Sequence, residues 1–86
     1  MSLVATDEYV VDECLIRASA SEVDLPGVQV WIGTWGIFRL PYEPGTLPDR
    51  YGDTGFHLTE GMVREMAKAI ASAIALALLI HEGMGN

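Results

Sequence analysis

Three side chains with oxygen or imidazole donors stand four residues apart in the middle of the chain: Asp49, Asp53 and His57. Carboxylate oxygens and imidazole nitrogens bind divalent metal ions, and Glu60 adds a carboxylate nearby. In a glycine-rich segment, however, a spacing of four does not bring side chains together, and no Cys-x-x-Cys or His-x-x-His pattern accompanies them. We favour turn formation, in which aspartate accepts bonds from nearby backbone amides, and we predict no metal site and no cofactor.

Catalytic chemistry has few candidates. His57 and His81 are the two possible general bases, and Cys14 is the single thiol nucleophile. Neither histidine has an obvious partner in the sequence, and Cys14 falls on an apolar pattern that is typical of a buried, inert thiol. The segment 33–36, Gly-Thr-Trp-Gly, lacks the spacing and the lysine of a phosphate-binding loop. We therefore predict no catalytic residue and a protein that is not an enzyme.

The composition limits the partners. The chain has 86 residues and a net charge of −7, half of its residues are hydrophobic, and we expect one domain, 1–86. Direct binding to nucleic acid requires lysine and arginine, but only Lys68 and four scattered arginines are present. The lone cysteine fits a reducing compartment, so we expect a cytoplasmic protein.

The segment 59–81 gives the strongest structural signal, and it predicts an α-helix rich in alanine, leucine and methionine. Thr59 is an N-cap candidate, and Glu60 would lie in the first turn. Gly83 supplies a stop signal, and we expect a mobile tail over 83–86. One side of this helix carries the residues that we expect to face the core: Met62, Met66, Ile70, Ala73, Ile74, Ala77 and Ile80.

After Ser72 the polar face of the predicted helix ends, and the segment 73–80 is apolar throughout. The uncharged run 69–80 is shorter than the ~20 residues of a membrane span, so we expect no membrane contact. An apolar side away from the core instead favours a second helix from another copy of the chain. Alanines at 67, 71 and 75 would let two helices approach closely. We predict homodimer contacts at Ala75, Leu76 and Leu79.

The rest of the chain is less clearly patterned. The segment 6–18 fits one helix face, although its β-branched residues keep a strand as the rival. Pro26-Gly27 predicts a turn, and 28–40 predicts either a hairpin closed at Gly33-Thr34 or one bent strand with a glycine bulge. Three prolines and three glycines predict an irregular loop over 41–58. The expected fold is α+β, with a small hairpin or sheet packed by the long C-terminal helix and a shorter N-terminal helix.

Two further surfaces suggest protein contacts. In the hairpin interpretation Trp31 and Trp35 lie on the side away from the helix, half exposed, where aromatic residues serve either as contacts or as core. Glu8, Asp12 and Glu13 would form an acidic face, which is either solvated or presented to a partner with a basic surface. We predict a self-associating protein–protein interaction module. The alternative is an acidic inhibitor or nucleic-acid mimic, and a small metal-binding protein or enzyme is less favoured.

Overall fold

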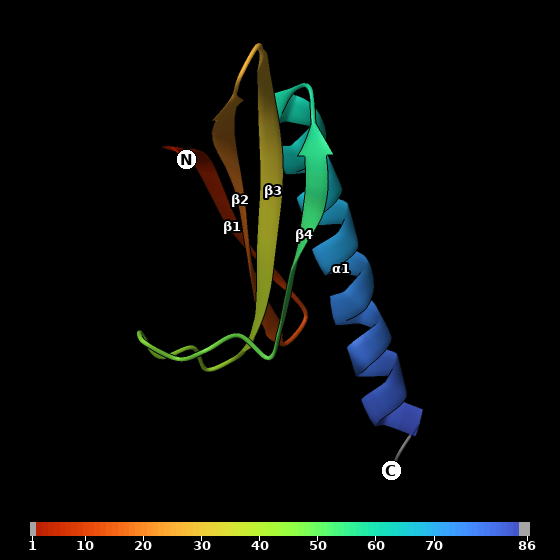
Figure 1. Ribbon diagram of the computed structural model, residues 1–86. Helices are drawn as coiled ribbons and strands as arrows, with labels where there is room; N and C mark the ends of the chain where they lie inside the picture. Colours follow the sequence, from red (N-terminus) through yellow and green to blue (C-terminus); the bar gives the residue numbers. More distant parts are fainter. Residues whose placement is uncertain (1, 85–86) are drawn as a thin grey trace.

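The computed structural model describes the backbone of residues 2–84 and the side chains of residues 5–80. Its architecture is α+β: a four-stranded antiparallel sheet in the order β1-β2-β3-β4, followed by one long helix (Figure 1). The elements are β1 (Ser2–Val11), β2 (Cys14–Leu25), β3 (Val28–Arg39), β4 (Arg50–His57) and α1 (Glu60–Met84).

The N-terminal helix expected over 6–18 is wrong, and the rival strand interpretation is closer, although two strands rather than one cover the segment. This segment forms the end of β1, a turn at Asp12 and Glu13, and the start of β2. Asp12 has a φ of 52°, a left-handed conformation that aspartate tolerates better than most residues. The β-branched and aromatic residues before the turn prefer the pleated conformation, and pairing with β2 decides the outcome.

The turn at Pro26-Gly27 is confirmed, and Gly27 supplies the positive φ of 79°. The hairpin expected at Gly33-Thr34 is wrong, because β3 pairs with β2 in unbroken register over its whole length. The rival bent strand is closer to the structure, with a register shift between Ile32 and Thr34 on the side that pairs with β4.

The irregular loop expected over 41–58 is also wrong in part, because its second half is strand β4. β4 is a short edge strand, and Gly55 has a φ of 76° close to the register shift. Glycines at such an irregularity weaken the sequence signal of a strand without preventing edge pairing. The irregular connection that remains runs from residue 40 to residue 49 and projects from the side of the sheet away from α1 (Figure 1).

Helix α1 begins where the sequence predicts. The backbone N–H of Met62 donates to Thr59 Oγ1 at 3.2 Å, which confirms Thr59 as the N-cap. The helix continues through Gly83 to Met84, so the expected stop at Gly83 is wrong. Of the tail expected to be mobile, 83–84 lie in the helix and 85–86 lie outside the described residues.

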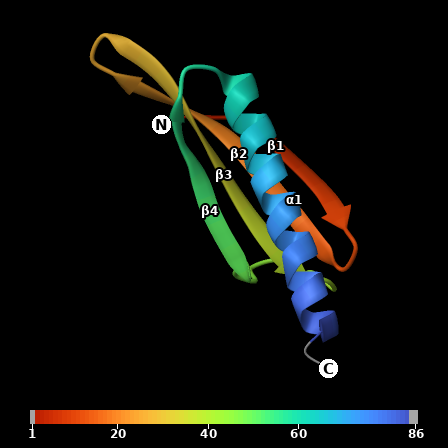
Figure 2. The same ribbon diagram turned by 90° about the vertical axis from the view of Figure 1, so that its right-hand side faces the viewer.

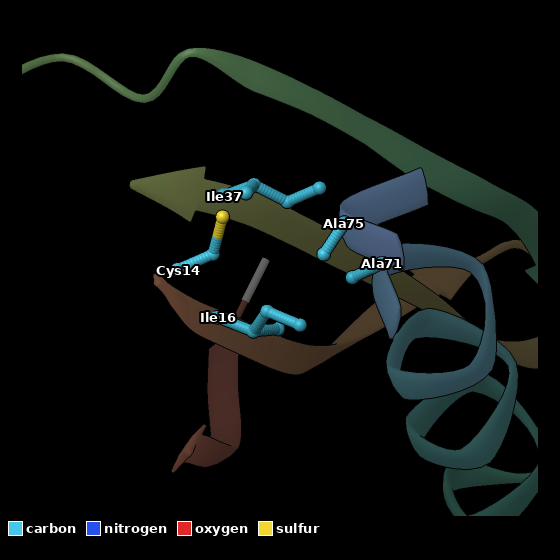
Figure 3. Packing of buried hydrophobic residues seen from close by; sticks show 5 residues of the cluster. All are labelled: Cys14, Ile16, Ile37, Ala71 and Ala75. Carbon is cyan, nitrogen blue, oxygen red and sulfur yellow. The ribbon is translucent and has the colours of Figure 1, made fainter. Parts of the chain in front are cut away.

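The core lies between one face of the sheet and α1, which crosses that face along its length (Figure 2). Ile16 and Ile37 pair across β2 and β3 and point toward the helix, where Ala71 and Ala75 meet them (Figure 3). Cys14 completes this buried cluster, so its predicted burial is confirmed. The alanines let the helix backbone come close to the sheet, and the side chains of Ile16 and Ile37 fill the space between the two layers.

Candidate interaction surface on the C-terminal helix

Helix α1 contacts the sheet along a line of small residues with a spacing of four. Val63, Ala67, Ala71 and Ala75 are all fully buried. The alanines expected to bring two helices together therefore bring the helix to its own sheet. Gly33 on β3 supports the same close approach, because a Cβ there would lie 2.6 Å from the carbonyl oxygen of Val63.

The polar side of the helix faces β1 rather than open solvent. Two nitrogens of Arg64 donate to the Asp7 carboxylate at 3.1–3.3 Å, and this pairing lowers the pKa of Asp7 and raises that of Arg64. The Tyr9 hydroxyl donates to the carbonyl oxygen of Lys68 at 3.0 Å and lies 2.8 Å from Ser72 Oγ. These bonds fix the rotation of the helix about its own axis.

This rotation turns much of the predicted core face outward. Met62 is 49% exposed and Ile80 is 63% exposed, and Ala73 and Ala77 are exposed as well. Ile70 and Ile74 are half-buried, so they border the sheet-facing line. Most of the predicted core face of the helix points away from the sheet, because its larger side chains fit the narrow gap between helix and sheet less well than alanine does.

The outward-facing apolar residues follow one line along the helix. At 3.6 residues per turn, this line and the sheet-facing line lie about 160° apart around the helix. Met66 on this line is half-buried, while the other members are exposed. No strand lies on that side of the helix within the described chain (Figure 2). We call six residues the outer stripe: Met62, Met66, Ala69, Ala73, Leu76 and Ile80.

The predicted contact residues on the helix have different positions. Leu76 is 47% exposed and belongs to the outer stripe, whereas Ala75 is fully buried beneath the helix. Leu79 is half-buried. Four other stripe residues were missed as contacts because they were assigned to the core: Met62, Met66, Ala73 and Ile80. Ala69 was assigned to neither surface. The alternating spacing of four and three residues along the stripe was the signal in the sequence that distinguishes these residues.

The two tryptophans lie on the opposite face of the sheet from the one expected. Alternation along β3 places Trp31 and Trp35 on the face that α1 covers, with both side chains half-buried. Trp35 packs against the core cluster and over Gly52 of β4, where a Cβ would lie 2.7 Å from the indole ring. Within the described part of the chain, the buried indole N–H of Trp35 has no hydrogen-bond partner.

The predicted acidic face is not one surface. The Glu8 carboxylate accepts a bond from Arg17 at 3.2 Å on the face of the sheet away from α1, while Asp12 and Glu13 occupy the exposed turn. Arg17 also lies over the rings of Phe38 and Tyr42, at 5.2 and 5.6 Å from their centroids. The bonds that Arg17 donates to the Tyr42 hydroxyl and the Glu8 carboxylate raise the pKa of Arg17. This arrangement holds the start of the 40–49 connection against the sheet.

The candidate metal and catalytic residues have structural roles. Asp53 Oδ1 accepts from the backbone N–H of Gly55 at 2.8 Å, the turn chemistry that the sequence favours. Asp49 forms an ion pair with Arg39, and His57 Nε2 lies 3.1 Å from the carbonyl oxygen of Thr54. Among the described residues, no group of three or more His, Cys, Asp or Glu side chains is arranged to hold a metal ion.

The thiol of Cys14 is buried, and desolvation raises its pKa, so the reactive thiolate is disfavoured. The side chain of the second candidate base, His81, lies outside the described residues. These positions leave the outer stripe as the candidate surface on α1.

Comparisons with known proteins name no relative: the sequence matches no protein-family model, and no curated protein and no solved structure matches it either. Among residues 2–84, no helix combines the length and the apolar character needed to cross a bilayer.

Proposed function

We propose that the chain is a non-enzymatic protein–protein interaction module that self-associates through the outer stripe of α1. The observation that carries this proposal is the exposure of large apolar side chains at Met62, Leu76 and Ile80 on the side of the helix opposite the sheet. Single exposed apolar residues are ordinary on protein surfaces, but a continuous apolar line on one helix face is typical of an interaction site. In a self-associated pair, the outer stripe of one copy would be buried against the outer stripe of the other.

The expected affinity is low. Only three large side chains per copy would be covered, each of them already partly buried on the helix, and association also costs translational and rotational freedom. Each copy also carries a net charge of −7, and the two copies repel one another at low salt. We therefore expect a weak dimer, populated at high micromolar concentration and strengthened by added salt.

Sedimentation equilibrium across the micromolar range tests the proposal with two variants that change the charge equally. Leu76→Glu places a carboxylate in the stripe, and we expect it to weaken the dimer at least tenfold. Leu47→Glu is the matched control, because Leu47 is 83% exposed in the 40–49 connection, and it should associate like the wild type. Circular dichroism checks that both variants are folded. A wild-type chain that sediments as a monomer at every concentration would exclude the proposal.

The acidic-mimic alternative has no specific observation in its favour. Glu8 is paired with Arg17, and Asp12 and Glu13 lie in a turn rather than on the same face as Glu8. A cytoplasmic location stays a prediction that rests on the single cysteine.

A further inference from the structure

The outer stripe has the spacing of a helix-pairing seam. Its members follow one another at intervals of four, three, four, three and four residues, the pattern of the apolar positions in a heptad repeat. Residues at these intervals stay on one side of a helix and interlock with the same positions of a neighbouring helix. The half-buried Ile70 and the exposed Ala77 extend the apolar surface on the side of the stripe nearer the sheet.

The stripe is also symmetric about its own middle, at the level of Ala71. Met62 and Ile80 stand nine residues before and after that level, and Met66 and Leu76 stand five residues before and after it. Ala69 and Ala73 stand two residues on either side. Large side chains therefore occupy both ends, and small side chains occupy the centre.

We propose that the partner of this surface is a second copy of the chain, bound antiparallel through a two-fold axis at the level of Ala71. This inference rests on the proposed function, and it specifies how the two copies meet. Met62 of one copy then lies against Ile80 of the other, Met66 against Leu76, and Ala69 against Ala73. The alanines let the helix axes approach at the crossing point, and the larger residues fill the space where the helices diverge.

The helix dipoles favour the antiparallel direction. An antiparallel pair sets the opposite ends of the two dipoles next to each other, whereas a parallel pair sets like ends together. A parallel pair would also bring the two Glu65 side chains, each 77% exposed and paired with Lys68 of its own helix at 3.2 Å, to the same end of the contact. In the antiparallel pair residues 60–68 of one helix, with two acidic and two basic side chains, lie beside residues 74–82 of the other, where Glu82 is the charged residue.

The contact area fits a weak, reversible dimer. The stripe is about 27 Å long at 1.5 Å per residue, and a helix is about 10 Å wide, so the pair covers roughly 300 Å² on each copy. A standard stable interface covers about 800 Å² per partner, so this one belongs to the transient class. The stripe lies on the side of α1 opposite the sheet, so the two sheets of the pair lie on the outer sides of the two helices.

Disulfide trapping distinguishes the two directions. Met62→Cys and Ile80→Cys are prepared as separate proteins, one with a cleavable tag, and are oxidised alone and as a mixture near the dissociation constant. In the antiparallel dimer positions 62 and 80 of different copies are in contact, whereas the two copies of position 62 are about 27 Å apart. We expect at least tenfold more disulfide between the two variants than within either one. The wild type is the control for the buried thiol of Cys14.

Each outcome has a distinct meaning. A disulfide formed mainly within Met62→Cys alone and Ile80→Cys alone shows a parallel pair, which overturns this inference and leaves self-association through the stripe intact. A chain that dimerises in sedimentation but forms none of these disulfides overturns the arrangement of the stripe as a seam. A chain that does not dimerise in sedimentation overturns the proposed function itself.

Discussion

Gly33 of β3 lies directly beneath the backbone of Val63 in α1. A Cβ at position 33 would stand 2.6 Å from the Val63 carbonyl oxygen and 2.9 Å from Cγ2 of Thr54. The nearest atom belongs to helix backbone, so a methyl group at this position requires the helix to move away from the sheet. We predict that Gly33→Ala lowers the free energy of unfolding by about 1–3 kcal/mol, the usual cost of overpacking, measured by urea denaturation.

The matched control is Gly61→Ala, which adds the same methyl group in the first turn of α1, where no atom lies within 4 Å of the new Cβ. Alanine restricts the unfolded chain and favours the helix, so this variant should be more stable than the wild type by about 0.5 kcal/mol. If both variants gain stability, the helix lies farther from β3 than the distance to Val63 indicates.

Tyr9 connects β1 to the helix through its hydroxyl. The group donates to the carbonyl oxygen of Lys68 and lies within bonding distance of Ser72 Oγ, in a partly buried position. We predict that Tyr9→Phe lowers the free energy of unfolding by about 0.5–1.5 kcal/mol, because the Lys68 carbonyl oxygen and the Ser72 hydroxyl both lose their hydrogen-bond partner on β1. Tyr51→Phe, at a side chain that is 77% exposed, should be neutral. Equal effects of the two substitutions would show that the Tyr9 bond adds no stability.

The sequence predicted the local features of this fold better than the non-local ones. The cap at Thr59 and the turn at Pro26-Gly27 follow from the chemistry of adjacent residues, and both are present. Strand β1 depends on pairing with β2, and the edge strand β4 depends on pairing with β3. A short segment of sequence does not show which distant strand it will pair with. The helix pattern in 6–18 therefore led to a wrong helix prediction, and the glycines in 50–57 led to a wrong loop prediction.

The face of α1 was misjudged for a related reason. An amphipathic pattern places polar residues in solvent, but Arg64 and Ser72 have partners on β1 that are about 60 residues away in the sequence. The contact with the sheet also selects for small side chains, so Ala67 and Ala71 are buried while larger residues remain outside. A prediction from hydrophobicity alone buries the larger apolar side chains first and leaves the alanines outside. The apolar character of the helix and a role in self-association were nevertheless predicted from the sequence, and the second stays a prediction.

The ion pair between Asp7 and Arg64 should make stability depend on pH. The hydrogen bond from Arg64 lowers the pKa of Asp7 below its ordinary value of 3.8 in the folded chain. A lowered folded pKa contributes stability that is fully present above the unfolded value and is lost as pH falls through the folded value. We predict that the difference in the free energy of unfolding between wild type and Asp7→Asn shrinks from about pH 5 to about pH 2.

Asp24→Asn is the control for this pH series, because it removes one negative charge from an exposed position at the end of β2. At neutral pH we expect Asp7→Asn to cost more stability than Asp24→Asn, and the two variants should converge in acid. A difference between wild type and Asp7→Asn that stays constant across the series would show that the carboxylate charge does not carry the interaction with Arg64.

The thiol of Cys14 should be inert in the folded protein. It is 1% exposed in the core cluster, and burial raises its pKa, so both access and the reactive thiolate are limited. Reaction of Cys14 with a disulfide reagent then requires transient unfolding. We predict that Cys14 reacts at least about a hundredfold more slowly in the folded protein than in the urea-unfolded chain. Leu47→Cys gives an internal comparison, because the thiol introduced at this exposed position should react fast while Cys14 in the same molecule reacts slowly. Equal rates for the two thiols would mean that the space between α1 and the sheet opens readily, and the close packing of Ala71 and Ala75 against Ile16 would then not describe the molecule in solution.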